Sequence, residues 1–175
     1  MELLQLDPLQ MVARSHDLAL HSRVAGYTPA YLDDLLYRKR EFFDSGGTLE
    51  VRPMRELPYW RVVMRRKTSA GRWGTYAAQN AEAIEAARAA LHAAGGPLSN
   101  RDFAGGPRVE KNYRGRKQSA LALYWLWLAG EVMTHHRQAF ERWYDLRENV
   151  APAEFDREAP EPEAERYLMR KLVAH

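Results

Sequence analysis

The sequence predicts an α+β fold that is mainly helical with small β-hairpins, built from winged helix-turn-helix units in tandem. Apolar residues recur at helical spacing in several segments, and proline, glycine or capping residues stand at the segment ends. The second half also shows a long helix, a short capped helix, a basic helix and a hairpin, the order of a winged helix. The predicted units are 1–75, a diverged winged-helix-like half, 76–152, a winged helix, and 153–175, an acidic tail that contains prolines.

The first half contains three predicted helices and one short strand. Asp7 and Pro8 make a helix-start signal, because Asp is a favoured N-cap and Pro suits the first helical position. The expected elements are, in chain order, a helix from Asp7 to about Arg23, a helix that starts at Thr28-Pro29, a strand near Leu49–Arg52 and a basic helix in LPYWRVVMRRK.

The second half starts with a predicted loop and linker, SAGRWGTY. An alanine-rich helix follows and is closed by a glycine pair, which favours a helix end. The later elements are, in order, this helix at 77–94, a short helix with Phe103 capped by Ser99 or Asn100, a helix at 113–129, and two strands in EVMTHHRQAFERWYDL with a turn near His136–Gln138. The helix at 113–129 is basic in its first turns and apolar in its later ones, so its second half is expected to be buried.

The composition excludes several kinds of protein. Cysteine is absent, which rules out disulfides and cysteine metal sites. No apolar run is long enough to cross a membrane, and no signal-peptide pattern opens the chain. We therefore expect a cytoplasmic, nucleoid-associated protein with no membrane partner. No cofactor is expected because nucleotide motifs are missing, and no metal site is expected at His135-His136, because neighbouring strand residues point to opposite faces.

Positive charge is concentrated in two stretches, although the net charge is only +3. Residues 52–73 and 108–117 are basic and contain Trp and Tyr, which is typical of a nucleic-acid surface. A solvated face without a partner is the alternative. The expected partner is double-stranded DNA, damaged DNA included, and no oligomeric state is indicated. The predicted DNA-binding residues are Arg61, Arg65, Arg66 and Lys67 in the first stretch, Arg114, Arg116, Lys117 and Gln118 in the recognition helix, and His135, His136 and Arg137 in the wing. A helical core with an unrelated hairpin is the alternative to the winged helix.

Several stretches together resemble one family. LLQLDPLQMVARSHDLALHSRVAGY, GPLSNRDFAG and RKQSALALYWLWLAGEVMTHHRQAFERWYDLRENVAP are similar to segments of the winged-helix DNA glycosylases of the AlkZ/YcaQ type, bacterial enzymes that repair alkylation damage and interstrand crosslinks. Members of this family are longer, so the resemblance implies that the chain corresponds to their N-terminal part. They carry a catalytic Gln-aliphatic-Asp or Gln-aliphatic-Gln tripeptide, and Gln5-Leu6-Asp7 matches the first form.

The resemblance implies a chemistry that fits these side chains. A purine alkylated at N7 carries positive charge and is a good leaving group, and its loss produces an oxocarbenium-like sugar. Asp7 would stabilise that cation and help to deprotonate a water, while the amide of Gln5 would position the water or the sugar. No metal or cofactor is needed. The plainer interpretation makes Asp7 a helix N-cap and Gln5 an exposed terminal residue.

Three functions therefore compete. The first is a DNA glycosylase acting on alkylated or crosslinked purines, with Gln5 and Asp7 in its site. The second is a non-catalytic winged-helix DNA-binding protein, either a regulator or a degenerate or truncated relative of the glycosylases. The third is a protein-interaction module, since winged helices also bind proteins.

Overall fold

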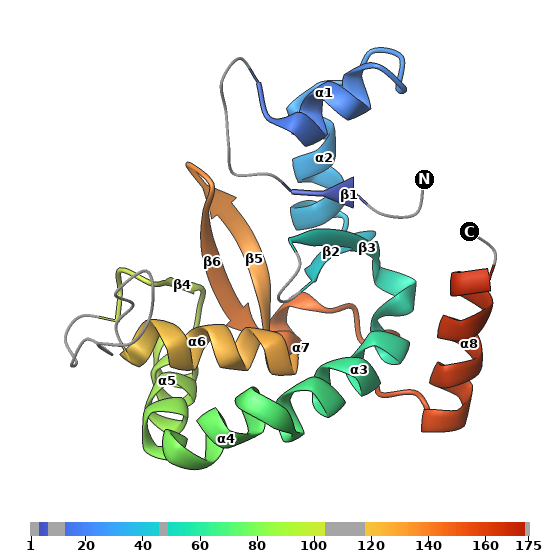
Figure 1. Cartoon of the computed structure of the whole chain (residues 1–175). Coiled ribbons are helices and arrows are strands. Elements are labelled where there is room, and N and C mark those ends of the chain that lie inside the picture. Colours follow the sequence, from blue (N-terminus) through green and yellow to red (C-terminus); the bar gives the residue numbers. More distant parts are fainter. Residues whose placement is uncertain (1–3, 7–12, 46–48, 104–117, 174–175) are drawn as a thin grey trace.

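The computed structural model describes residues 4–6, 13–45, 49–103 and 118–173. It contains helices and two small three-stranded sheets, which confirms the α+β class, while the winged-helix topology stays a prediction (Figure 1). The helices are α1 (Ser15–His21), α2 (Pro29–Asp33), the π-helical turn η1 (Asp34–Arg38), the 3₁₀ turn η2 (Met54–Glu56), α3 (Leu57–Ser69), α4 (Gly71–Gln79), α5 (Ala81–Ala94), α6 (Gln118–Ala129), α7 (Arg147–Val150) and α8 (Glu161–Val173). The strands are β1 (Leu4–Gln5), β2 (Phe42–Ser45), β3 (Glu50–Pro53), β4 (Leu98–Ser99), β5 (Val132–Gln138) and β6 (Glu141–Leu146).

The first sheet has the order β1-β3-β2 and is antiparallel throughout. The predicted strand near Leu49–Arg52 is confirmed as β3, whereas β1 and β2 were not predicted. Because β1 has only two residues, too few for an alternating pattern, periodicity could not reveal it. The sheet places the start of the chain beside a segment more than forty positions further on, at the pairs Leu4↔Val51 and Gln5↔Glu50.

The second sheet has the order β4-β6-β5, and the predicted hairpin is confirmed as β5 and β6. Its turn was placed too early, however. The chain reverses at Ala139 and Phe140, which both have positive φ (47° and 68°). Two consecutive positive φ angles match the right-handed twist of a tight hairpin, so β5 continues through the residues assigned to the turn.

Three helical predictions need correction. α1 begins only at Ser15, because Arg14 has an extended backbone; the start predicted at Asp7 lies outside the described residues. The predicted linker SAGRWGTY is largely α4. The expected short helix after Ser99 is replaced, up to Phe103, by β4 and a turn in which Ser99 N–H and Oγ both donate to Asp102 Oδ2 (2.7 and 2.9 Å).

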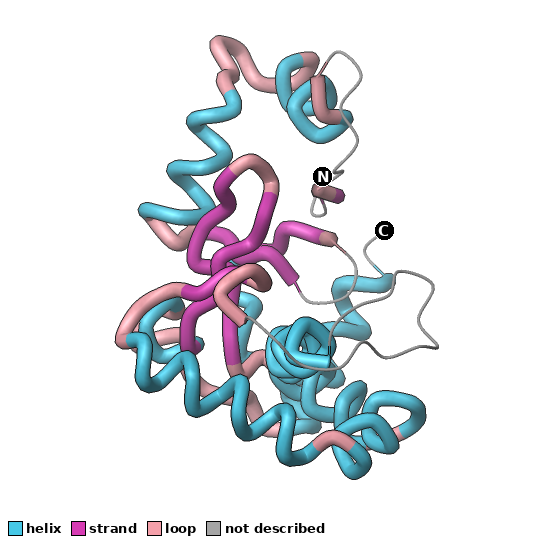
Figure 2. Tube along the Cα trace, turned by 90° about the vertical axis from the view of Figure 1, so that its left-hand side faces the viewer, coloured by secondary structure: helices cyan, strands magenta, loops and turns pink. Residues whose placement is uncertain are grey.

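The largest core lies between α5, α6 and the second sheet, which α6 covers along one face (Figures 1 and 2). As predicted, the later turns of α6 are buried. A second core joins α3 to the first sheet, the β5–β6 hairpin and α7, and a third joins α1, α2 and η1 to the other face of the first sheet. The predicted acidic tail contains α8, which packs on Val62 of α3 through Ala164 and, just before the helix, Ala159, and on Tyr59 through the stacked ring of Tyr167. Within the described residues, no helix has the length and apolar character to span a bilayer.

Gly130 ends α6 in the left-handed region (φ 71°), with Met64 Sδ only 2.7 Å from where a β-carbon would stand. We expect Gly130→Ala to lower the free energy of unfolding by about 1–2 kcal/mol from the backbone alone, and further from the Met64 contact. Gly95→Ala is the matched control, since Gly95 has a similar φ (60°) but open space around it. Urea denaturation of both variants measures the difference, and equal losses would contradict a role for Met64.

Candidate active site

β1 holds Gln5 at the edge of the first sheet. Leu6 N–H donates to Leu49 O (2.6 Å), and Leu6 is only 2% exposed, packed with Val51 in the core below α2. Gln5 is exposed, because successive strand residues point to opposite faces. The buried leucine thus anchors the strand and leaves the neighbouring amide accessible.

A series of contacts between charged and aromatic side chains begins next to Gln5. Its cross-strand neighbour Glu50 forms an ion pair through Oε2 with Arg52. The guanidinium of Arg52 lies 3.5 Å from the centre of the Trp60 ring, a cation–π contact. Burial lowers the pKa of Arg52, and Glu50 and Glu56 oppose that shift. Arg52 is therefore held in place between a carboxylate and an indole.

The same series of contacts continues from Trp60 to α8. Trp60 Nε1 donates to Glu56 Oε2 (3.1 Å), and Lys171 Nζ on α8 donates to both oxygens of Glu56 (2.6 and 2.8 Å). Burial and, to a smaller extent, Glu56 raise the pKa of Tyr167 to about 12. Through these contacts α8 supports the sheet face on which Gln5 and Glu50 lie.

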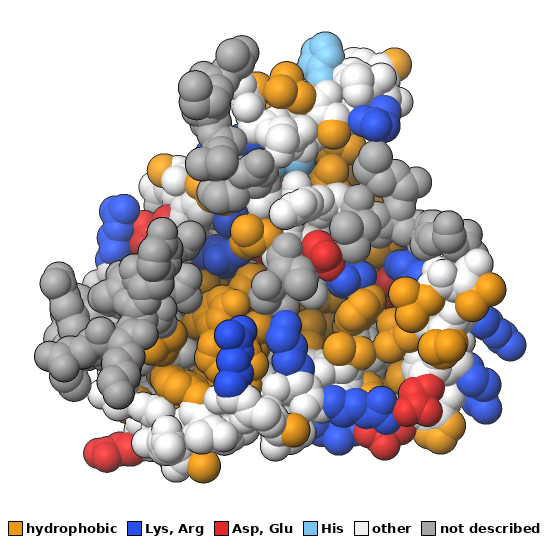
Figure 3. All heavy atoms as spheres, in the orientation of Figure 1, with side chains coloured by type: hydrophobic (Ala, Val, Ile, Leu, Met, Phe, Trp, Pro, Cys, Tyr) orange, Lys and Arg blue, Asp and Glu red, His pale blue; other side chains and the backbone are white. Residues whose placement is uncertain are grey.

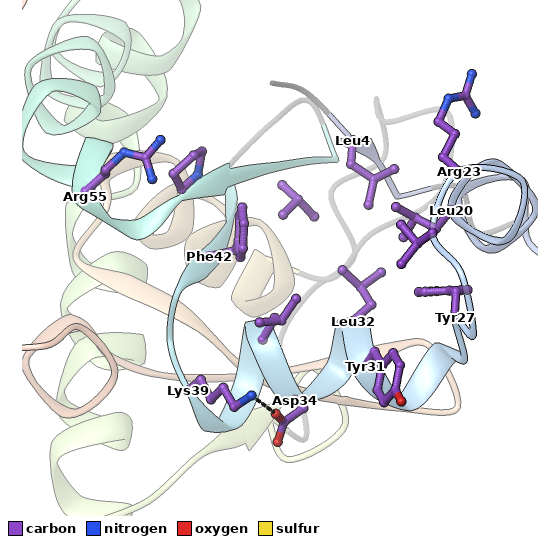
Figure 4. Close-up of a pocket in the computed structure, with 14 residues that line it drawn as sticks. Leu4, Leu20, Arg23, Tyr27, Tyr31, Leu32, Asp34, Lys39, Phe42 and Arg55 are labelled. Atoms are coloured by element: carbon purple, nitrogen blue, oxygen red, sulfur yellow. Dashed lines mark ion pairs between the residues drawn. The ribbon is translucent and has the colours of Figure 1, made fainter. Parts of the chain in front are cut away.

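An apolar pocket of 610 Å³ lies on the opposite face of β1 (Figure 4). Leu4, Leu20, Leu32 and Phe42 point into it, while Arg23 and Arg55 stand at its two ends. Lys39 at its rim is already paired with Asp34 (3.0 Å). Because Leu4 faces this pocket, Gln5 faces away from it. This apolar pocket and the polar face are therefore separate features.

A buried ion cluster joins the two sheets. Asp44 on β2 accepts hydrogen bonds at Oδ2 from Arg137 and from Arg142 (3.4 Å) and is contacted by Thr134 Oγ1 (3.3 Å). The Asp44 side chain is 0% exposed and that of Arg137 is 8% exposed. The ring of Phe140, at the hairpin turn, packs on Arg137 and Arg14. The hairpin is thereby fixed against the N-terminal half.

The family model described as DNA glycosylase AlkZ-like matches residues 1–175. The chain belongs to the AlkZ-like DNA glycosylase family. Membership makes DNA its partner and DNA repair its general function. No solved structure matches the chain.

The structure describes two of the three residues in the Gln5-Leu6-Asp7 tripeptide, which the AlkZ-like resemblance implies is catalytic. Gln5 and Leu6 lie on and just after β1, as above, and Asp7 lies outside the described residues. So do Arg114, Arg116 and Lys117 of the predicted recognition helix. Gln118 begins α6, half-buried, and its Nε2 donates to Asn80 Oδ1 (3.3 Å).

The basic helix of this AlkZ-like chain is confirmed as α3, but three of its arginines already have partners. Arg65 pairs with Glu158 and Glu161, and Arg66 with Glu161 and Glu165. Figure 3 shows basic and acidic side chains side by side in the region where α3 meets α8. Arg61 contacts Asp156 (3.4 Å), and Lys67 is exposed. Acidic residues on α8 and in the segment just before it thus neutralise much of the predicted DNA-binding helix.

The wing residues are also placed differently from the prediction. Arg137 is buried against Asp44 rather than projecting to a phosphate. The pairing register shifts between Thr134 and His136, a bulge that brings His135 Nδ1 within 2.9 Å of His136 Nδ1. The expectation that the two rings face apart was therefore wrong. Burial lowers the pKa of both rings, as does Arg40, which favours uncharged imidazoles. Among the described residues, no three His, Asp or Glu side chains could together hold a metal ion.

Glu50, Arg52 and Asp44 were missed by sequence reasoning. Glu50 and Arg52 are two positions apart on a short strand, which indicates that their side chains lie on the same face. Their proximity to Gln5, however, depends on the pairing of β1 with β3. Asp44 follows two phenylalanines in FFDS, and an acid inside an apolar run is a usable signal for a buried ion pair.

Proposed function

We propose that the chain hydrolyses the N-glycosidic bond of N7-alkylated or crosslinked purines in DNA, with Gln5 and Asp7 as its catalytic pair. The observation that carries the proposal is that a chain of the AlkZ-like family exposes the amide of Gln5 on a strand anchored by buried Leu6. An exposed amide on an anchored strand is accessible to a substrate, and its backbone is held in position.

The reaction balances without a metal or cofactor. The bond between C1′ and N9 breaks, and its electron pair goes to the base and neutralises the cationic purine. The oxygen of a water molecule bonds to C1′, and its proton passes to the carboxylate of Asp7 and then to solvent. Gln5 accepts a hydrogen bond from that water or donates one to the sugar.

A winged-helix mode of DNA binding is the second part of the proposal. It is supported by the order of α6, β5 and β6 and by the pairing of β4 with β6. Gln118, at the first position of α6, and Arg114, Arg116 and Lys117, which precede it in the sequence, would then contact DNA. We place exposed Lys67 on the same DNA surface, joined by Arg61, Arg65 and Arg66 when their acidic partners on and before α8 give way.

The test is release of N7-methylguanine from alkylated duplex DNA under single-turnover conditions. The wild-type chain is expected to release the base, and Asp7→Asn and Gln5→Ala to lose most of that activity while still binding DNA. Gln79→Ala removes an exposed glutamine from α4 and serves as the control. Binding without base release by the wild-type chain would instead support a non-catalytic DNA-binding protein.

A further inference from the structure

Gln5 on β1 lies directly opposite Glu50 on β3, in the type of cross-strand pair whose side chains are closest together. The hydrogen bond from Leu6 N–H to Leu49 O joins the residues that flank this pair. In an antiparallel ladder that pattern marks a non-hydrogen-bonded pair, whose Cα atoms are only about 4.5 Å apart, closer than in the hydrogen-bonded kind. The amide and the carboxylate thus start from neighbouring positions on one face.

Glu50 is held where it can act on that amide. Its Oε2 is engaged by Arg52, which is itself stacked on Trp60. Trp60 is fixed by Glu56, and Glu56 by Lys171. The side chain of Glu50 is 19% exposed, so it lies at the rim of this network rather than in its interior. Because Arg52 engages Oε2, the second oxygen, Oε1, is the one left to accept a hydrogen bond from a neighbouring side chain.

The chemistry of the two groups then determines which end of the amide faces the substrate. A glutamine amide has one donor end and one acceptor end, and turning it over exchanges them. A carboxylate only accepts hydrogen bonds. A carboxylate beside Gln5 therefore draws the NH₂ group to itself and leaves the amide oxygen free to accept a hydrogen bond from a water.

We propose that Glu50 is a positioning residue of the glycosylase site: it accepts a hydrogen bond from the Gln5 amide and turns the amide oxygen toward the attacking water. This inference rests on the proposed function. Arg52 and Trp60 hold the carboxylate in place. Neither Glu50 nor Arg52 needs to touch the DNA.

The experiment uses the same single-turnover release of N7-methylguanine, with DNA affinity measured in parallel. Glu50→Gln keeps the shape of the side chain but adds a donor, so the amide of Gln5 is no longer held in one orientation. We expect the rate of base release to fall by about ten- to a hundredfold, the effect of losing a charge-assisted hydrogen bond, with DNA affinity unchanged. Glu50→Asp, which keeps the acceptor-only group, should recover part of the rate. Glu41→Gln, at an exposed position just before β2, is the control.

A double variant separates positioning from a structural role. If Glu50 acts through Gln5, then adding Glu50→Gln to Gln5→Ala should cause no further loss of rate. Multiplied losses in the double variant, or full activity in Glu50→Gln, would overturn this inference and leave the glycosylase proposal intact. A wild-type chain that releases no base would overturn both.

Discussion

Replacing Asp44 with Ala is expected to lower the free energy of unfolding by about 3–5 kcal/mol, as is usual when one member of a buried ion cluster is removed. Asp44 is fully buried and is the carboxylate that faces both Arg137 and Arg142. Without it, two guanidinium groups stay in an apolar region packed against Phe140 and Trp127. Urea denaturation followed by tryptophan fluorescence measures the loss.

Two comparisons make this result specific. Asp34→Ala also removes an aspartate from an ion pair, but Asp34 faces the exposed Lys39, and we expect a much smaller change. Adding Arg137→Met to Asp44→Ala removes one of the uncompensated charges and should restore part of the stability. A loss for Asp44→Ala no larger than for Asp34→Ala would show that this cluster does not hold the hairpin to the N-terminal half.

Neutralising the acidic partners on and before α8 is expected to increase affinity for double-stranded DNA. In the triple variant Glu158→Gln, Glu161→Gln and Glu165→Gln, Arg65 and Arg66 lose the carboxylates that they contact. Two freed arginines can each neutralise a phosphate, so at low salt we expect roughly tenfold tighter binding and a salt dependence steeper by about two phosphate contacts. Fluorescence anisotropy at several salt concentrations provides the measurement.

The control is a second triple variant that makes the same change in net charge at other positions of the fold. Glu41→Gln, Glu82→Gln and Glu148→Gln remove three exposed carboxylates from other parts of the fold. If this variant strengthens binding as much as the first, net charge explains the effect and α3 does not contact DNA. A steeper salt dependence confined to the first triple variant would show that α3 is part of the DNA surface.

Most helices could be predicted because their signals lie within a few residues. α2 begins with the Thr28-Pro29 pair, and α5 is alanine-rich and ends at left-handed Gly95, as predicted. The errors fell where local signals conflict or are too short. α4 contains two glycines that suggested a loop, and its helix is stabilised instead by packing of Trp73 against Tyr76 and Tyr124.

The candidate site could likewise be predicted from the sequence only in part. The tripeptide is visible in the sequence, and so is its family, because both are matters of residue identity and spacing. The partners of those residues are not visible there. Asp44 and Arg137 are 93 positions apart, and Arg65 and Glu158 are also 93 positions apart.

The sequence by itself determined the α+β class, the hairpin, the basic helix and membership of a DNA glycosylase family, because periodicity, caps and motifs are properties of short segments. Only the tertiary structure decided that Gln5 lies beside Glu50, that Arg137 is buried and that α8 covers α3. These outcomes depend on which distant charges and strands meet. Their physical reason is the cost of burying an unpaired charge or backbone group, which is settled only when the whole chain packs.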